Sequence, residues 1–326
     1  MDGLRALTVV VRGPRALPRW AIATLVANIV IVITGGLVRL TGSGLGCPTW
    51  PRCTDASYVS HPELGYHGAI EFGNRLLTFA LIAIAVCTLL SAIFTPEDGP
   101  RRHSVRRLAV GLALGIPAQA VIGGLSVLYQ LNPYVVALHL VISMILICLA
   151  VWLVRMTRRA AAKSASRLAV WSTRTTFATM AIVILLGTLV TGSGPHAGDE
   201  QVARSGLDGL LLTHLHASMV YLTIALTVVC RILLRTPEVI LLLAVEIGQA
   251  AIGLTQYHLG VPIWLVALHL LGASLAIAAA TNLMLSVRSP GRRQPADGPL
   301  VAVPAAAVPG DPDQVGRTVQ DPHGLA

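Results

Sequence analysis

The sequence predicts an all-α integral membrane protein with eight transmembrane helices, built as two tandem four-helix bundles related by internal duplication. Three observations lead to this fold class: an apolar composition, a one-sided distribution of basic residues, and passages that repeat at constant spacing. Of the 326 residues, 54% are hydrophobic and only 12% are charged, whereas about a quarter of a soluble domain is charged. The composition therefore excludes an ordinary soluble protein.

Eight stretches are apolar enough for a membrane helix, which needs about 20 mostly apolar residues. In chain order they are 20–40, 67–94, 108–130, 135–154, 169–191, 209–230, 238–257 and 262–287. The first follows a charged stretch and lacks a small-residue cleavage site. We therefore expect it to be a retained helix rather than a signal peptide.

The basic residues separate to one side of these spans. Most of the 24 precede the first span, lie between spans two and three, four and five, or six and seven, or follow the eighth. Cytoplasmic loops of membrane proteins carry such an excess of Lys and Arg. We therefore predict a multi-pass protein of a bacterial cell membrane with both termini in the cytoplasm. The net charge of +9 then reflects membrane topology, and no nucleic-acid partner is expected.

The chain divides into five predicted segments. A cytoplasmic N-terminal segment (1–19) precedes an N-terminal four-helix half (20–154), which contains an external loop (41–66). A basic linker (155–168) leads to the C-terminal half (169–287). The tail (288–326) is rich in Pro, Gly, Ala and Asp and nearly free of large apolar residues, a composition typical of disorder.

Two of the five cysteines lie in the external loop. Cys47 and Cys53 are separated by five residues that include two prolines, and the loop faces the oxidising side, where disulfides persist. We expect a disulfide, the alternatives being two free thiols or a metal site. No Cys-x-x-Cys-His attachment motif is present, so any haem would be held by coordination and packing.

Polar residues inside the spans repeat at matching intervals. Gln119 precedes His139 by the same 20 residues that separate Gln249 from His269, at an offset of 130. The element Thr-Gly-Ser-Gly also recurs, at residues 41–44 and 191–194. Helices one to four therefore correspond to helices five to eight, and a duplicated four-helix bundle is the natural architecture.

Histidines inside a span are costly and usually functional. A haem between helices needs axial ligands that project inward from facing helices. His216 and His269 fit that geometry in the C-terminal half, and His139 with a helix-two residue fits it in the N-terminal half. His214 and His216 are two residues apart and point to roughly opposite sides of their helix, so only one can face the bundle centre. Aligning helix six on helix two places His216 at the position of Asn74, so we favour His216. The alternative is that these histidines form hydrogen bonds to neighbouring helices.

Helix two carries the most informative acid. His67, Glu71 and Asn74 lie at i, i+4 and i+7 and so share one helix face. Thr213 occupies the place of Glu71 in the other half. A carboxylate beside a haem could serve as a general base, the alternative being a structural pair with Arg75.

A second acid within the spans has no counterpart at the corresponding position of the other half. Glu246, near the middle of helix seven, is either a group behind a ligand or a hydrogen-bonding partner within the bundle. The sequence does not choose between these roles.

Together these features resemble the haem A synthase family, membrane enzymes that convert haem O to haem A for cytochrome oxidases. The resemblance covers about residues 20–287. It rests on the glycine-rich end of helix one (35–45), the Cys47–Cys53 loop, the Glu71–Arg75 passage and the duplicated histidine helices.

The resemblance implies a role for each site residue. His216 and His269 would bind a resident haem b, and His139 would be an axial ligand of the substrate haem O. Glu71 would be the catalytic carboxylate, and Cys47 and Cys53 would form the external disulfide. The reaction would be the successive oxidation of a ring methyl to a formyl group, with water as the oxygen source and electrons leaving through the second haem. Haem O synthase and cytochrome oxidase assembly would be partners, while the membrane electron acceptor is not indicated.

One residue departs from the family pattern. The family commonly has Glu-x-x-His-Arg in helix two, whereas this chain has Asn74 before Arg75. Asparagine is a poor iron ligand, so the second axial position of the substrate haem is open. His67 could take it, the iron could be five-coordinate, or Asn74 could only form a hydrogen bond to a ligand; we favour His67. Asn74 and Arg75 are expected to contact the substrate.

Two other functions fit the histidines. A diheme electron carrier resembling cytochrome b561 would hold two permanent haems and would not need Glu71. A non-catalytic haem carrier would bind haem reversibly and leave it unchanged.

Overall fold

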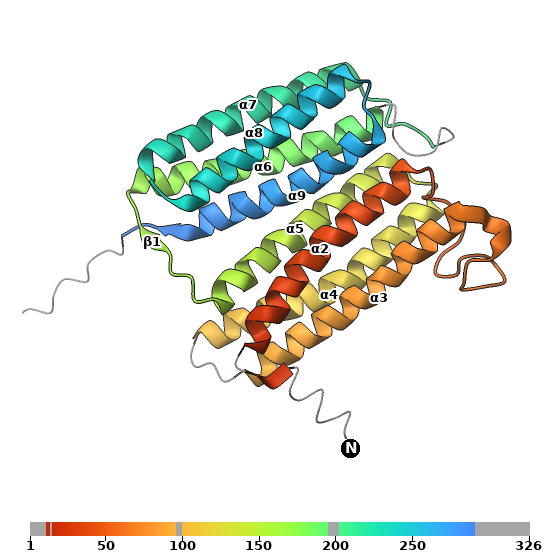
Figure 1. Ribbon diagram of the computed structural model, residues 1–326, viewed down its shortest axis with the longest axis horizontal. Coiled ribbons are helices and arrows are strands. Elements are labelled where there is room, and N and C mark those ends of the chain that lie inside the picture. The colour runs from red at the N-terminus through yellow and green to blue at the C-terminus, as the bar shows by residue number, and fades with distance from the viewer. Residues whose placement is uncertain (1–10, 14, 96–99, 195–201, 291–326) are drawn as a thin grey trace, which may run out of the picture. The chain divides into compact units, whose positions relative to one another are not determined.

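The computed structural model describes residues 11–13, 15–95, 100–194 and 202–290. Its helices in chain order are α2 (Ala16–Leu40), α3 (Gly65–Phe94), α4 (Pro100–Leu128), α5 (Pro133–Thr157), α6 (Arg167–Ser193), α7 (Gly209–Leu233), α8 (Pro237–His258) and α9 (Ile263–Ser286). A 3-10 turn, η1 (Pro62–Leu64), precedes α3. All eight helices are long and apolar enough to cross a membrane, which confirms the predicted all-α membrane fold (Figure 1).

The helices form two groups of four. In the first group α2, α3, α4 and α5 contact one another in a closed ring, and in the second group α6, α7, α8 and α9 do the same. The groups meet where α5 and α2 pack against α9 and where α5 packs against α6. One cluster of buried side chains joins them, with Val32 and Ile147 from the first group beside Ile277 and Ala280 from the second. The common origin of the two groups stays a prediction.

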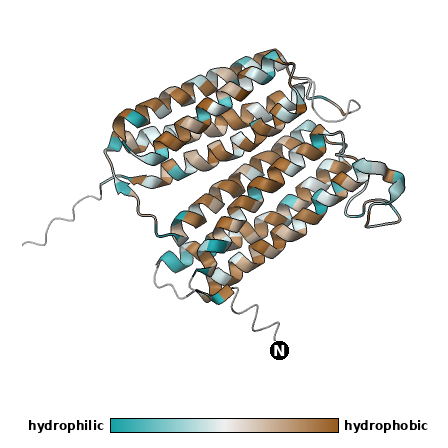
Figure 2. Ribbon diagram, in the orientation of Figure 1, coloured by the Kyte–Doolittle hydropathy of each residue, from teal (hydrophilic) through white to brown (hydrophobic). Residues whose placement is uncertain are grey.

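The outer surface of the helices is apolar. Large hydrophobic side chains such as Leu114, Tyr221 and Ile232 are about two thirds or more exposed, at 68, 69 and 74%. Figure 2 shows hydrophobic residues along the helices and hydrophilic ones mainly near their ends. Exposed apolar patches on this scale mark surfaces that contact a membrane or a partner. The chain is thus a multi-pass membrane protein.

Local sequence explains where several helices begin. The side chain of Asn132 accepts a hydrogen bond from Tyr134 N at the start of α5, and Ser166 accepts one from Ala169 N at the start of α6. Asp208 accepts from the backbone N–H groups of Leu210 and Leu211 at the start of α7. These caps satisfy N–H groups that have no partner within the helix.

Helix α4 begins earlier than its apolar stretch predicted. We placed the span at 108–130, whereas the helix runs from Pro100, so a basic stretch expected in a loop forms its first turns. Arg101 donates to the carbonyl of Met156, and Arg106 donates to that of Ile93 at 2.6 Å. These contacts to the ends of neighbouring helices explain why the helix extends beyond the apolar region.

The predicted tail is partly ordered at its beginning. Strand β1 (Lys163–Ser164) in the linker pairs in parallel with β2 (Val287–Arg288), so Arg288 belongs to the ordered part of the chain. The rest of the predicted tail from residue 291, and residues 1–10 and 14 of the N-terminal segment, lie outside the described residues.

Candidate functional site

Two histidines face each other inside the second helix group. His216 of α7 and His269 of α9 have ring centroids 6.4 Å apart and ring planes at 67°. Nδ1 of His216 lies 2.9 Å from the carbonyl oxygen of Val183 in α6. Because a carbonyl only accepts, that nitrogen carries the hydrogen, and Nε2 of the neutral ring keeps a free lone pair. His214, two residues earlier, is exposed.

The spacing of this pair fits an iron between two axial imidazoles. A metal–imidazole bond is about 2 Å long in zinc sites, and a five-membered ring of bonds of about 1.33 Å has a radius of roughly 1.1 Å. Two rings on opposite sides of one metal therefore have centroids roughly 6 Å apart. Among the described residues no group of three His, Cys, Asp or Glu side chains could hold a metal ion. The remaining ligands of a metal here would come from an organic molecule such as a porphyrin.

Small residues make room for the histidine rings. An ideal Cβ on Gly187 would lie 3.2 Å from Cε1 of His216, and one on Gly253 would lie 3.3 Å from Cε1 of His269. These approaches are closer than ordinary van der Waals contact, so a side chain at either glycine would push the ring. The sequence analysis did not single out these glycines, although Gly253 lies within the repeated passage.

The histidine of the first helix group has matching surroundings. An ideal Cβ on Gly123 would lie 3.2 Å from Cε1 of His139. Gln119 donates to the backbone carbonyl of His139 at 3.0 Å, just as Gln249 donates to that of His269 at 2.7 Å. Nδ1 of each of these two histidines is buried without a hydrogen-bonding partner. Both positions thus offer a buried imidazole nitrogen that a bound group could engage.

Asn74 is the residue that the predicted duplication aligns with His216 of the second group. Its Nδ2 lies 3.8 Å from an ideal Cβ on Gly35 of α2, as His216 lies beside Gly187 of α6. Its Oδ1 is buried and has no hydrogen-bonding partner. The amide therefore points into the interior of the first group, at the position that corresponds to a histidine in the other.

His67 is engaged at the end of α3 nearer the external loop. Its Nδ1 lies 2.9 Å from the Ser43 hydroxyl, and its ring stacks at 3.9 Å on that of Tyr66. The structure thus gives the ring a partner within the loop region.

Glu71 lies beneath the disulfide loop. Cys47 and Cys53 form the predicted disulfide, and both are fully buried. Glu71 Oε2 accepts the backbone N–H of Cys47 at 2.6 Å. Its Oε1 accepts from Nη2 and Nε of Arg75 at 2.6 and 3.2 Å, and the Glu71 side chain is only 7% exposed. The acid that the sequence analysis singled out is therefore tied both to the loop and to Arg75.

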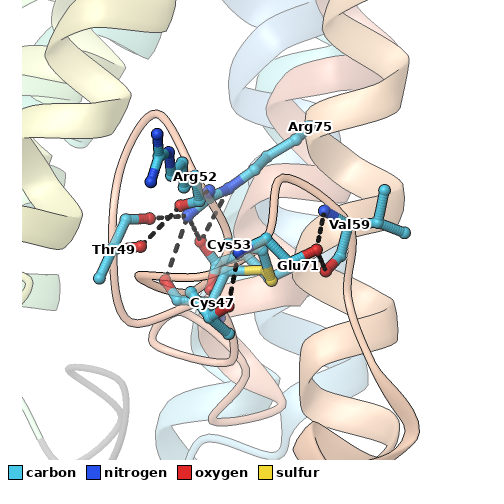
Figure 3. The surroundings of a disulfide bond; sticks show 9 residues. Cys47, Thr49, Arg52, Cys53, Val59, Glu71 and Arg75 are labelled. Carbon is cyan, nitrogen blue, oxygen red and sulfur yellow. Dashed lines mark hydrogen bonds and ion pairs between the residues drawn. A yellow bond between two sulfur atoms is a disulfide. The ribbon is translucent and has the colours of Figure 1, made fainter.

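Arg75 also holds the loop directly. Its guanidinium donates to the backbone carbonyls of Cys47, Thr49 and Arg52 at 3.0–3.1 Å, and Figure 3 shows the side chain reaching from α3 into the loop. Sequence reasoning found the Glu71–Arg75 pair but not these contacts, because backbone carbonyls leave no trace in the sequence.

The tip of the loop covers the helix that lies beside His139. The ring of Trp50 occupies the space that a Cβ on Gly124 would fill, and the adjacent Gly123 contacts His139. The disulfide loop, Glu71 and His139 therefore belong to one end of the first helix group.

Comparison with known proteins identifies the family of the chain. Residues 18–198 match the model of a family described as cytochrome oxidase assembly proteins. The chain belongs to this family. Haem A synthases of Listeria welshimeri and Bacillus licheniformis are 32% identical to it over 128 and 132 residues, and that of Lysinibacillus sphaericus is 33% identical over 132. The matches cover 39–40% of this chain and 40–42% of the relatives, so the chain spans about two fifths of the length of the relatives it matches.

Proposed function

We propose that the protein is a haem A synthase of a bacterial cell membrane, which oxidises a methyl group of haem O to a formyl group. The observation that carries this proposal is the facing pair of His216 and His269, in a chain that belongs to an oxidase assembly family. The similarity to haem A synthases supports the reaction. On this proposal a haem O synthase supplies the substrate, cytochrome oxidase assembly consumes the product, and both termini are cytoplasmic.

The second helix group would hold a resident haem b. His216 and His269 would hold its iron, and the hydrogen bond from His216 to Val183 would keep Nε2 of His216 free to bind it. Gln249 would fix the backbone of His269. When bound, this haem would supply a one-electron carrier.

The first helix group would bind the substrate, haem O. His139 would hold its iron, and Asn74 would line the same site without supplying a strong ligand. His67 is our candidate for the second ligand, and it would have to release Ser43 to reach the iron.

Glu71 would act as the proton acceptor. Converting a methyl to a formyl group with one water releases four electrons and four protons. An ionised carboxylate has about four lone-pair sites, and three N–H groups of Cys47 and Arg75 occupy three of them. One site stays available for a proton or for the attacking water. Arg75 keeps the carboxylate ionised and aligned, and with Asn74 it would contact the substrate.

The proposal is tested by expressing the protein with a haem O source and separating the extracted haems by chromatography. We expect hydroxylated and formylated products. Bound haem with no modified product would refute the enzyme and favour an electron carrier or a haem carrier.

Glu71→Gln should keep haem bound and lose product. The matched control is Glu63→Gln, which alters an exposed acid in η1 on the same side of the helices and should leave product formation intact. Equal product from the Glu71 variant would refute its assigned role.

A further inference from the structure

The second helix group contains a buried acid that the proposed reaction does not use. Glu246 of α8 is 4% exposed. Its Oε1 lies 2.9 Å from the hydroxyl of Thr227 in α7, while its Oε2 is buried with no hydrogen-bonding partner. A buried carboxyl with one oxygen unpaired is unusual, because such a group in low dielectric costs several kcal/mol when ionised.

The hydrogen bonds of Thr227 indicate that the carboxyl carries a proton. The hydroxyl lies 2.9 Å from Glu246 and 3.0 Å from the backbone carbonyl of Thr223. A hydroxyl has one hydrogen but two acceptor lone pairs. One hydrogen shared between two acceptors makes two weaker bonds, whereas a protonated Glu246 could donate to Thr227 while Thr227 donates to the carbonyl, so the arrangement favours a protonated carboxyl.

No cationic side chain on the neighbouring helices α6, α7 and α9 is paired with Glu246 in the described part of the chain. On α9 the ionisable side chain is His269, and on α6 the ionisable residues Arg167 and Arg174 are exposed. On α7 the ionisable residues are exposed His214 and Tyr221, half-buried His216 and Arg231, and buried Cys230. In the part of the chain that the structure describes, the only ion pair between side chains is the one of Arg75 with Glu71. Glu246 therefore has no paired cation.

A column of polar groups extends from this acid in both directions. His216, Thr223, Thr227 and Cys230 lie at i, i+7, i+11 and i+14 of α7 and so on one face. The Cys230 thiol, close to the end of α7, lies 3.5 Å from the Thr176 hydroxyl. Towards the histidines, Glu246 is one turn, about 4.5 Å of helix rise, from Gln249, which bonds the backbone of His269.

We infer that Glu246 is a proton-binding site coupled to the charge of the haem between His216 and His269. The inference rests on the proposed haem b. One electron reaching that site removes one positive charge, and Glu246 then binds one proton as a neutral acid. When the electron leaves, the carboxyl releases the proton, and the ionised form is balanced by the restored positive charge. The electrons come from the methyl oxidation, and the protons come from that reaction or from water at the Cys230 end.

The test uses the whole protein in lipid nanodiscs, prepared without a haem O source so that it holds haem b alone. The midpoint potential is measured by spectroelectrochemistry across a pH series. A tenfold change in proton concentration shifts a one-electron, one-proton couple by 59 mV. We expect the wild-type potential to fall with a slope approaching that value, and the slope to fall at least twofold in Glu246→Gln.

The control is Glu238→Gln, in which an acid two turns away on the same helix, half-buried near Arg155, is neutralised. It should keep the wild-type slope. Infrared difference spectra provide a second readout: reduction should produce a protonated-carboxyl band that Glu246→Gln lacks. If that variant does not fold, Thr227→Val keeps the acid, and it should shift the frequency of the same band.

The outcomes separate this inference from the proposed function. A wild-type protein with haem b but a pH-independent potential, or a Glu246→Gln variant with the wild-type slope, would overturn the inference and leave the enzyme standing. A band unaffected by Thr227→Val would also overturn it. A wild-type protein that binds no haem b would overturn both.

Discussion

Replacing Arg75 with methionine should release the disulfide loop. In the structure the guanidinium joins Glu71 to three backbone carbonyls of the loop, and methionine keeps the length of the side chain but none of these contacts. Both cysteines are fully buried, so a thiol reductant can reach the disulfide only when the loop opens locally. Reduction kinetics therefore report the stability of the loop.

The magnitude follows from the pair that is broken. The side chains of Arg75 and Glu71 are 20 and 7% exposed, and removing one partner of a buried pair costs about 3–5 kcal/mol. The lower figure alone raises the opening equilibrium roughly 100-fold, since each 1.4 kcal/mol or so is tenfold. Reduction should accelerate by about the same factor. Arg75→Lys keeps the charge but not the planar fork of donors. Its reduction rate should therefore lie between those of the wild type and Arg75→Met.

The assay is incubation with dithiothreitol followed by denaturation and labelling with a mass-tagged maleimide. Three free cysteines give three tags before reduction, and all five cysteines give tags after it. The control is Arg52→Met, because the Arg52 guanidinium is exposed, donates to the carbonyl of Asp55 and lies 5.3 Å from the Tyr58 ring, all within the loop. A reduction rate of Arg75→Met within threefold of wild type would refute the view that Arg75 holds the loop.

Two further substitutions test the histidine sites. Gln249→Leu removes the hydrogen bond to the carbonyl of His269, which contributes about 1 kcal/mol, so haem b should transfer to apomyoglobin about fivefold faster. Gln119→Leu should leave that rate unchanged, and equal rates for the two variants would refute the assignment. Asn74→His should make the first helix group retain haem more strongly, because it adds an imidazole nitrogen at a buried position beside Gly35. The haem content measured by pyridine haemochrome should rise towards two per chain, and a content no higher than that of Asn74→Leu would contradict this.

The sequence predicted the helices because apolar length and basic clusters are direct consequences of the membrane. The same rule placed the start of α4 too late, because it assigns basic residues such as Arg101 and Arg106 to a loop. In the structure these residues lie in the helix and contact the ends of neighbouring helices. His216 and His269 were paired from the sequence because inward-facing positions on facing helices converge. The sequence could not predict which backbone carbonyls accept hydrogen bonds from Arg75, or that Val183 accepts one from His216. Every residue has a carbonyl, and only the fold determines which of them lies near a given donor.

The two buried acids show how the groups of four helices divide the proposed work. Glu71 has a cation and a backbone N–H beside it, so its charge is compensated before any substrate arrives, and it is suited to accept protons at the reacting carbon. Glu246 has one hydroxyl beside it and no paired cation among the described residues, so its charge would be compensated by a proton or by the positive charge of a haem bound in the same helix group. An electron entering the second group removes that positive charge. On the proposed function, the acid without a paired cation therefore lies in the helix group that would store electrons, and the acid paired with Arg75 lies in the group where protons would be released.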